Sequence, residues 1–355
     1  MKLVIFGLTV SSSWGNGHAT LWRGLISALV EQRHRVVFFE KDLPFYAPHR
    51  DLRELPRGAE LIFYPTWEEA LPRARQELAD ADVGMVTSYC PDGVAASREV
   101  LDSPVSVRCF YDMDTPITLE QAQRGEPVEY IPPEGLGGFD LVLSYTGGQA
   151  LTALRAVLGA RHVAPLYGSV DPGVHYPVAP KNSYQGDLSY LGTYAANRQA
   201  ALERFFLEPA RRLPHRRFVI GGAQYPADFA WTDNLFFVRH LPPAEHPAFY
   251  CSSKLTLNVT RGPMAEMGYC PSGRLFEAAA CGVPVLSDDW EGLSTFFRPG
   301  EELLVARTTE DALAALSCSP EELIRIGQAA RERTLTEHTA THRAAELVAL
   351  LDARS

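Results

Sequence analysis

The sequence predicts an α/β protein with two doubly wound, Rossmann-like domains, each built on a parallel sheet. Short runs of β-branched and apolar residues alternate with segments of helical periodicity, which is the pattern of successive βαβ units. A stretch rich in turn-forming residues, from Tyr167 to Gly186, interrupts this alternation near the middle of the chain. A chain of 355 residues is long enough to form two domains of ordinary size.

The hydrophobic pattern places the expected elements along both halves of the chain. In the first half, strands are expected at 3–6, 35–39, 61–64, 83–87, 105–109, 141–144 and 162–164, and helices at 18–32, 67–80, 91–102 and 148–158. In the second half, strands are expected at 188–191, 218–220, 235–238, 255–258, 283–286 and 303–305, and the chain is expected to be helical from 320 to the end. We therefore predict an N-terminal domain at 1–168, a linker at 169–186 and a C-terminal domain at 187–335, with a terminal helix at about 336–355 that packs back on the first domain.

Composition limits the class of protein. A formal net charge of −10 without a stripe of basic residues argues against a nucleic-acid partner. No apolar run approaches the roughly 18 residues of a membrane span, and the first residues lead directly into a strand without a cleavage site. The six cysteines show no paired metal spacing and are expected to be small core residues in a reducing compartment. We therefore expect a cytoplasmic globular protein.

The segment Pro271–Leu286 carries the most information in the chain. Its helix is expected to start at the N-cap Ser272, to stop at Gly282, and to be apolar nearly all round except for Glu277. A buried unpaired charge costs several kcal/mol, roughly, so Glu277 must meet a cation, hydrogen-bond donors or a ligand. The simplest alternative is an ion pair with Arg274, one turn earlier.

The start of this helix offers free N–H groups and the positive end of the helix dipole to an anion. A carboxylate at Glu277 suits a diol, and the helix start suits a diphosphate. Together these two features indicate a site for a nucleoside diphosphate.

The residues from Ser272 to Asp288, continued by Trp290-Glu-Gly-Leu and Pro299-Gly-Glu-Glu, resemble the C-terminal domain of the group 1 glycosyltransferases. The resemblance is closest to the spore-maturation-protein (CgeB-like) branch, extends over most of the chain and is specific in residues 258–306. It implies the GT-B fold, in which two Rossmann-like domains face each other across a cleft and Glu277 holds the donor ribose. It also implies a sugar transferase that takes a nucleoside diphosphate donor and needs no metal or other cofactor. The resemblance favours retention of the anomeric configuration, and inversion with Asp112 or Asp114 as the base stays open.

The resemblance assigns further residues to the donor. Gly192, Tyr194 and Arg198 lie in the loop after the first strand of the second domain, where a basic residue neutralises the departing diphosphate. The alternative for Arg198 is an exposed arginine at a helix start. Arg261 offers a second cation at the edge of the same sheet, and Ser272 and Gly273 begin the glutamate helix.

One position departs from the wider family. Tyr269 stands eight residues before Glu277, where many group 1 enzymes carry a first glutamate. It can stack on the nucleobase or contact the sugar hydroxyls, and both roles stay open. The nearby Asp288 is interpreted as a solvated turn acid, with contact to the donor sugar as the alternative.

Two loops of the first domain are expected to bear chemistry. Gly15, Gly17 and His18 follow the first strand and, by the resemblance, face the donor diphosphate and the acceptor. The alternative is a glycine-rich turn whose helix is capped by Asn16.

An acidic pair, Asp112 and Asp114, follows the fifth expected strand. We interpret the pair as acceptor-side residues, one of them a general base for the attacking hydroxyl, with an Asx-turn or capping pair as the alternative. One carboxylate pair supplies too few ligands to define a Mg²⁺ or Mn²⁺ site, so no metal is expected.

The remaining acceptor-side candidates are loop residues at the carboxyl ends of strands: Tyr89, Thr115, Gly147 and Gly148. For the two glycines the alternative is that they start the next helix. The acceptor itself can be a small molecule, a glycan or a protein.

Other functions fit the same fold. A nucleotide-sugar epimerase or phosphorylase would need no separate acceptor alcohol, and a non-catalytic nucleotide-sugar-binding protein would bind the donor without consuming it. An NAD-dependent enzyme needs an acid after the second strand, which Glu40 supplies, and a complete glycine fingerprint, which the first loop lacks.

Overall fold

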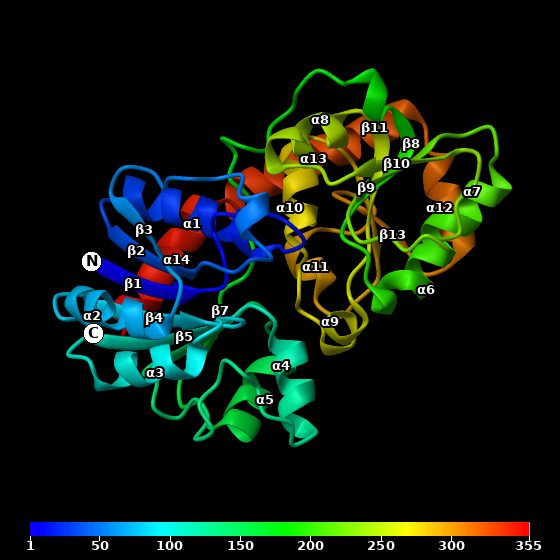
Figure 1. Cartoon of the computed structure of the whole chain (residues 1–355). Helices are drawn as coiled ribbons and strands as arrows, with labels where there is room; N and C mark the ends of the chain where they lie inside the picture. Colours follow the sequence, from blue (N-terminus) through cyan, green and yellow to red (C-terminus); the bar gives the residue numbers. More distant parts are fainter. Residues whose placement is uncertain (355) are drawn as a thin grey trace. The chain divides into compact units, whose positions relative to one another are not determined.

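A computed structural model describes residues 1–354 and divides the chain into two compact units (Figure 1). The first unit comprises Met1–Tyr167 together with the segment that begins at Ala340, and the second comprises Gly168–Thr339. Residues 169–186, expected as a linker, therefore belong to the second unit. Within the described residues, no helix combines the length and apolar character that a membrane span requires.

The first unit is built on a seven-stranded parallel sheet in the order β3-β2-β1-β4-β5-β6-β7. Its strands are β1 (Lys2–Gly7), β2 (Arg35–Lys41), β3 (Ala59–Tyr64), β4 (Val83–Thr87), β5 (Val107–Asp112), β6 (Leu141–Ser144) and β7 (Val163–Pro165). Its helices are α1 (His18–Glu31), α2 (Trp67–Leu78), α3 (Gly93–Asp102), α4 (Thr115–Gln123), α5 (Gln149–Leu158) and α14 (Ala340–Asp352). The strand order reverses between β1 and β4, so the loops after these strands lead to opposite halves of the sheet.

The second unit repeats this plan with a six-stranded parallel sheet in the order β10-β9-β8-β11-β12-β13. Its strands are β8 (Gly186–Leu191), β9 (Phe218–Gly222), β10 (Leu235–Arg239), β11 (Ser253–Asn258), β12 (Val285–Asp288) and β13 (Leu304–Ala306). Its helices are α6 (Gln199–Leu202), α7 (Glu208–Arg212), α8 (His246–Cys251), α9 (Gly262–Met267), α10 (Gly273–Ala280), α11 (Leu293–Phe296), α12 (Thr309–Leu316) and α13 (Pro320–Glu337), with a π-helical turn at Glu203–Leu207 between α6 and α7.

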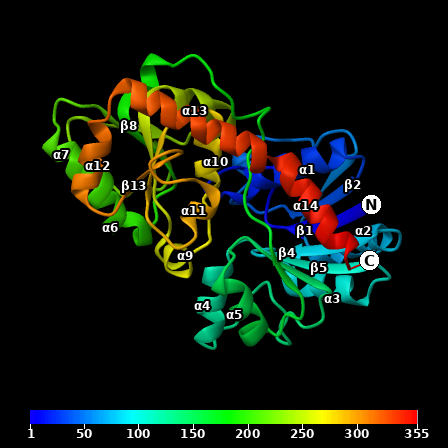
Figure 2. The same ribbon diagram turned by 180° about the vertical axis from the view of Figure 1, so that it is seen from behind.

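The central strands are buried on both faces, which explains their continuous apolar sequences. Every residue of β1 is buried, and Phe6 stacks on Phe39 of β2 with ring centroids 4.8 Å apart. In the second unit, Phe206, Phe218 and Leu255 belong to one core cluster and are each completely buried. Figure 2 shows α14 beside α1 within the first unit and α13 beside α10 within the second.

The strands predicted from the hydrophobic pattern are all present, with shifted boundaries. The largest shift concerns β5, which starts at Val107 and ends at Asp112, so that Asp112 is a strand residue and not a loop residue. Helix α4 was not predicted, because Asp114-Thr-Pro was interpreted as a turn. Asp114 is the N-cap of this helix and Pro116 lies in its first turn, where proline is well tolerated. The terminal helix is interrupted, since α13 ends at Glu337 and α14 begins at Ala340.

The contact between α13 and the end of α10 yields a test of the second unit's packing. A Cβ added to Gly327 of α13 would lie 2.4 Å from the carbonyl oxygen of Gly282, a backbone atom that cannot turn aside. Overpacking of this kind costs about 1–3 kcal/mol, whereas alanine gains at most roughly 1 kcal/mol of helix propensity. We therefore expect Gly327→Ala to lower the free energy of unfolding by up to about 2 kcal/mol in urea denaturation. The control is the exposed neighbour Gln328→Ala, and equal stability of the two variants would contradict this packing.

Candidate functional site

Glu277 lies in the middle of α10 and is only 8% exposed. The Tyr250 hydroxyl donates a hydrogen bond to its Oε2 at 3.2 Å. The same oxygen lies 3.8 Å from His246 Nδ1 and 4.0 Å from His175 Nε2. The buried carboxylate that the sequence singled out therefore meets one hydroxyl donor and two imidazoles.

Arg274, the alternative partner for Glu277, is engaged elsewhere. Its guanidinium donates to the carbonyl oxygens of Leu191 at 2.8 Å and Val259 at 2.9 Å, and to the Ser272 hydroxyl oxygen at 3.1 Å. Arg274 thus ties the ends of the central strands β8 and β11 to the start of α10. The predicted i,i+3 ion pair is not formed.

The two imidazoles beside Glu277 were missed by the sequence reasoning. His175 Nε2 lies 3.5 Å from His246 Nδ1, and His246 Nε2 donates to the Leu241 carbonyl oxygen at 3.2 Å. Burial lowers the pKa of His246 to about 4 and also lowers the pKa of His175, although Glu277 opposes both shifts. Both imidazoles are therefore neutral at neutral pH. No spacing rule connects these positions, which are 71 residues apart.

Cations gather at the start of α10. Arg198 donates to the Thr193 carbonyl oxygen at 3.2 Å, and its Nε has no hydrogen-bond partner among the described residues. Burial lowers the pKa of Arg198; Tyr190 opposes this shift, while the neighbouring Arg274 and Arg261 add to it. Arg198 is therefore not the exposed surface arginine of the alternative interpretation. Guanidinium groups held so close together favour an anion as their partner.

The first turn of α10 is not closed by its N-cap residue. Ser272 is the N-cap residue of α10, as predicted, but its side chain accepts from Arg274 and not from a helix N–H. A Cβ on Gly273 would meet only Glu277 Oε1, at 3.8 Å. Gly192 is required by packing, since a Cβ there would lie 2.8 Å from the Tyr190 hydroxyl and 3.2 Å from Arg274 Nη1.

The other donor-side tyrosines have distinct surroundings. Tyr194 packs in an aromatic cluster, with its ring 5.7 Å from that of Tyr225 and 6.3 Å from that of Phe229. Tyr269 has a left-handed backbone (φ 46°), and its N–H donates to the Glu291 carbonyl oxygen at 2.6 Å. Positive φ is costly for a tyrosine. Close packing of Gly268 against Glu291 and of Gly292 against the Tyr269 ring holds this backbone conformation.

Asp288 is not the solvated turn acid that the sequence suggested. It is 8% exposed and accepts from the backbone N–H of Thr260 at 3.0 Å and from its hydroxyl at 3.0 Å. Burial raises the pKa of this carboxyl, although the bonds to Thr260 act against the shift. Asp288 therefore anchors the loop that follows β11.

In the first unit, the structure brings together three of the residues predicted to be catalytic. His18 at the start of α1 contacts Asp114, with Nε2 and Oδ2 2.8 Å apart. The N–H of Asp114 donates to Asp112 Oδ1 at 3.0 Å, and the Thr118 hydroxyl donates to the same oxygen at 3.1 Å. The fourth predicted catalytic residue, Arg198, belongs to the second unit.

Asp112 is completely buried, and its Oδ2 has no hydrogen-bond partner among residues 1–354. Burial raises the pKa of this carboxyl to about 7, and the neighbouring Asp114 charge raises it as well. Asp112 thus orients the Asp114 backbone, and it is His18 and Asp114, each 8% exposed, that retain some access to solvent.

The first loop is held by Glu40, which is completely buried at the end of β2. Its carboxylate accepts from the Thr9 hydroxyl at 2.9 Å, the Val10 N–H at 2.7 Å, and the Ser11 N–H and hydroxyl at 3.0 and 2.5 Å. An NAD-dependent enzyme would need this carboxylate to bind the ribose of its cofactor. Because the four bonds already engage it, they argue against an NAD-dependent enzyme.

The glycine-rich loop follows the residues that Glu40 holds, and its geometry is that of a turn leading into α1. Gly17 is the N-cap residue of α1, and Oδ1 of the preceding Asn16 accepts from the Ala19 N–H in the first turn at 3.2 Å. Gly15 has φ 68°, a conformation that favours glycine. Gly17 has no such constraint, since a Cβ there would meet no atom within 4 Å.

The acceptor-side candidates fall into two groups. Tyr89, with φ 58° and 39% exposure, places its ring 6.1 Å from that of His18. Thr115 is completely buried, and its hydroxyl lies 2.7 Å from Ser144 Oγ. Gly147 packs against the Tyr167 hydroxyl, and Gly148 is the N-cap of α5 with φ 56°. Thr115 and the two glycines therefore have evident roles in the fold, and Tyr89 lies nearest the histidine.

Comparison with known proteins identifies the fold. Residues 198–349 match a family model described as "Glycosyl transferase-like". A search of curated proteins finds no match. The whole chain is similar to the sucrose-phosphate synthase of Thermosynechococcus elongatus, at 16% identity, a TM-score of 0.73 and 100% coverage of both chains.

Two further solved structures carry bound nucleotide. Anabaena HepE in complex with UDP and glucose is 13% identical, with a TM-score of 0.69 and 99% coverage of both chains. An α-glucosyltransferase in complex with UDP and a 13-mer DNA is 11% identical, with a TM-score of 0.69 and 99% coverage of both chains. The chain therefore has the two-domain GT-B fold of these glycosyltransferases.

The raised pKa of Asp112 predicts how stability depends on pH. Its folded-state pKa of about 7 exceeds the ordinary value of 3.8. The contribution of this carboxyl to stability is therefore complete below about pH 4 and is lost as the pH rises through about 7. Asp112→Asn stays neutral, and its Oδ1 still accepts from Asp114 and Thr118. We expect the stability of the wild type relative to this variant to fall between about pH 4 and about pH 7, measured by urea denaturation of both proteins. A constant difference would contradict the buried neutral carboxyl.

Proposed function

We propose that the chain is a glycosyltransferase that takes a sugar from a nucleoside diphosphate donor. The observation that carries this proposal is the first half of α10, where Glu277 is buried one turn after Arg274, and Arg274 lies close to Arg198. A carboxylate suits the ribose diol, and guanidinium groups beside open helix N–H groups suit a diphosphate. The UDP complexes of two proteins with the same fold support this assignment.

We assign the donor to the second unit and expect its diphosphate to be neutralised by Arg198, with Arg261 as the second cation. Negative charge builds on the diphosphate as the sugar leaves, so fixed cations stabilise the transition state more than the ground state. Guanidinium groups supply this charge without a bound ion, and we therefore expect the transfer itself to be metal-independent. Tyr269 is assigned to the nucleobase or the donor sugar.

We assign acceptor activation to the first unit. Asp114 and His18 form the polar pair that can hold or accept the proton of an acceptor hydroxyl, and Asp112 positions Asp114 through its N–H. Tyr89 is assigned to the acceptor as well. Retention of anomeric configuration and membership of the CgeB-like branch stay expectations that rest on the sequence resemblance.

A thermal-shift panel tests the donor assignment. UDP, GDP, TDP, CDP, ADP and NAD are added to the wild type, to Glu277→Ala and to the control Glu266→Ala, which removes an exposed acid from α9. A ligand at ~100 times its Kd should stabilise the wild type by about 2.7 kcal/mol, a shift of a few degrees. We expect one diphosphate to shift the wild type and the control but not Glu277→Ala. A shift with NAD alone, or with none of the six, would overturn the proposal.

The acceptor assignment predicts a selective loss of turnover. Asp114→Asn removes the charge beside His18, and general acid–base catalysis contributes about 10²–10⁴-fold, so we expect kcat to fall by at least about 100-fold. The Kd for the diphosphate should not change, because the donor residues lie in the other unit. The matched control is Asp102→Asn at the exposed end of α3. An unchanged kcat in Asp114→Asn would remove this residue from the mechanism. Donor turnover without an acceptor, followed by NMR, would instead favour an epimerase.

A further inference from the structure

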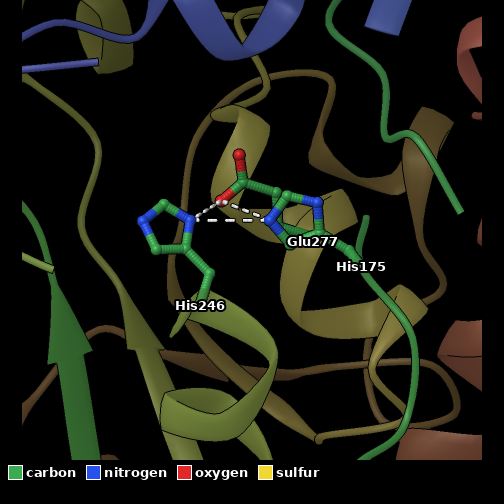
Figure 3. A group of neighbouring side chains, drawn as sticks. All are labelled: His175, His246 and Glu277. Atoms are coloured by element: carbon green, nitrogen blue, oxygen red, sulfur yellow. Dashed lines mark hydrogen bonds and ion pairs between the residues drawn. The ribbon is translucent and has the colours of Figure 1, made fainter. Parts of the chain in front are cut away.

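Three side-chain atoms in the second unit converge on one point. They are His175 Nε2, His246 Nδ1 and Glu277 Oε2, which come from the chain before β8, from the start of α8 and from the middle of α10 (Figure 3). The pairwise distances are 3.5 Å between the imidazoles, and 3.8 and 4.0 Å from the carboxylate oxygen to His246 and His175. A triangle with these sides has a circumscribed radius of about 2.2 Å, close to the roughly 2.0–2.2 Å that Zn²⁺ keeps from imidazole nitrogen and carboxylate oxygen.

The protonation of the imidazoles suits a metal ion. His246 Nε2 donates to the Leu241 carbonyl oxygen, so its Nδ1 presents a lone pair toward the other two atoms. His175 is buried and His246 is half-buried, and metal ligation requires the neutral form of each imidazole. His175 Nε2 faces the same point. This nitrogen presents a lone pair when the imidazole proton resides on Nδ1.

The contacts within the cluster leave these groups incompletely satisfied. His175 is 1% exposed, and its Nδ1 has no hydrogen-bond partner among the described residues. The separations of 3.5 to 4.0 Å are longer than good hydrogen bonds. A partly satisfied buried polar cluster is costly, and a cation at its centre would engage all three acceptors at once.

The surroundings also resemble those of a metal site. The Tyr250 hydroxyl holds Glu277 Oε2, and the Leu241 carbonyl oxygen fixes the tautomer of His246. Such outer contacts orient ligands in known metal sites. Two histidines and one carboxylate leave the fourth position of a tetrahedral ion open, and nitrogen ligands favour Zn²⁺ over Mg²⁺.

We propose that His175, His246 and Glu277 form a binding site for one divalent transition-metal ion, with Zn²⁺ as the best fit. The ion engages the carboxylate that the donor ribose needs, so metal and nucleotide compete; this consequence rests on the proposed function. The site is thus inhibitory, not catalytic. It departs from the sequence-based expectation that the protein binds no metal.

Titration of metal-free full-length protein with Co²⁺ tests the site without any nucleotide. We expect one equivalent to bind, with the visible absorption bands of four-coordinate cobalt bound by nitrogen and oxygen, and Zn²⁺ to displace it. His175→Phe fills the same buried space without a ligand and should weaken binding by at least about 100-fold. Glu277→Gln, which keeps an oxygen for Tyr250, should do the same, and the exposed His215→Ala is the matched control.

Three results would overturn the site. They are the absence of Co²⁺ binding to the wild type, equal binding by the wild type and both ligand variants, and near-ultraviolet charge-transfer bands that indicate thiolate ligands such as the nearby Cys251 or Cys281. Circular dichroism of each variant confirms that it is folded.

Competition is measured with the nucleoside diphosphate that the wild type binds, at a buffered free Zn²⁺ concentration that corrects for chelation by the nucleotide. We expect Zn²⁺ to raise the apparent Kd by at least about 10-fold in the wild type and not in His175→Phe. An unchanged Kd in the wild type would overturn the competition. Cobalt binding without nucleotide binding would uphold the metal site and reject the proposed function. Nucleotide binding without cobalt binding would uphold the proposed function and reject the metal site.

Discussion

Buried carboxylates at the carboxyl ends of parallel strands hold the loops that follow β1 in the first unit and β11 in the second. Parallel strands end with unpaired backbone N–H groups, and a desolvated carboxylate is tolerated only when several donors surround it. Glu40 receives four hydrogen bonds from the first loop, and Asp288 binds the N–H and hydroxyl of Thr260. Each loop is thereby fixed in one shape, because releasing it would leave a buried charge without donors.

Glu277 is buried to the same degree but lacks such donors. Its hydrogen bond comes from Tyr250, and its other near neighbours are two neutral imidazoles at 3.8 and 4.0 Å. Glu40 and Asp288 are satisfied by the fold, whereas Glu277 is only partly satisfied. This difference separates a structural carboxylate from one that is prepared for an external partner, whether a ribose hydroxyl pair or a metal ion.

The sequence predicted what depends on local pattern and missed what depends on tertiary contact. Strand positions followed from apolar runs, and the carboxyl ends of strands correctly indicated where His18, Asp112 and Asp114 lie. The 2.8 Å contact between His18 and Asp114 could not be foreseen, because 96 residues separate them. Helix α4 was not predicted. The proline was treated as turn chemistry, whereas it lies in the first turn of this helix. The roles of His175 and His246 had no sequence signal, since their significance arises from proximity to Glu277.

The cations of the second unit bear on the expectation that the proposed transfer is metal-independent. The hydrogen bonds of Arg198 and Arg274 go to neutral oxygen atoms, so these bonds do not neutralise either charge. The chain has a formal charge of −10, and acidic partners for arginine are abundant on its surface. Burial and the charges of Arg274 and Arg261 lower the pKa of Arg198, so a bound anion would stabilise its charged form. A leaving nucleoside diphosphate has more negative charge than the sugar-linked donor, so this arrangement favours the departing group over the ground state.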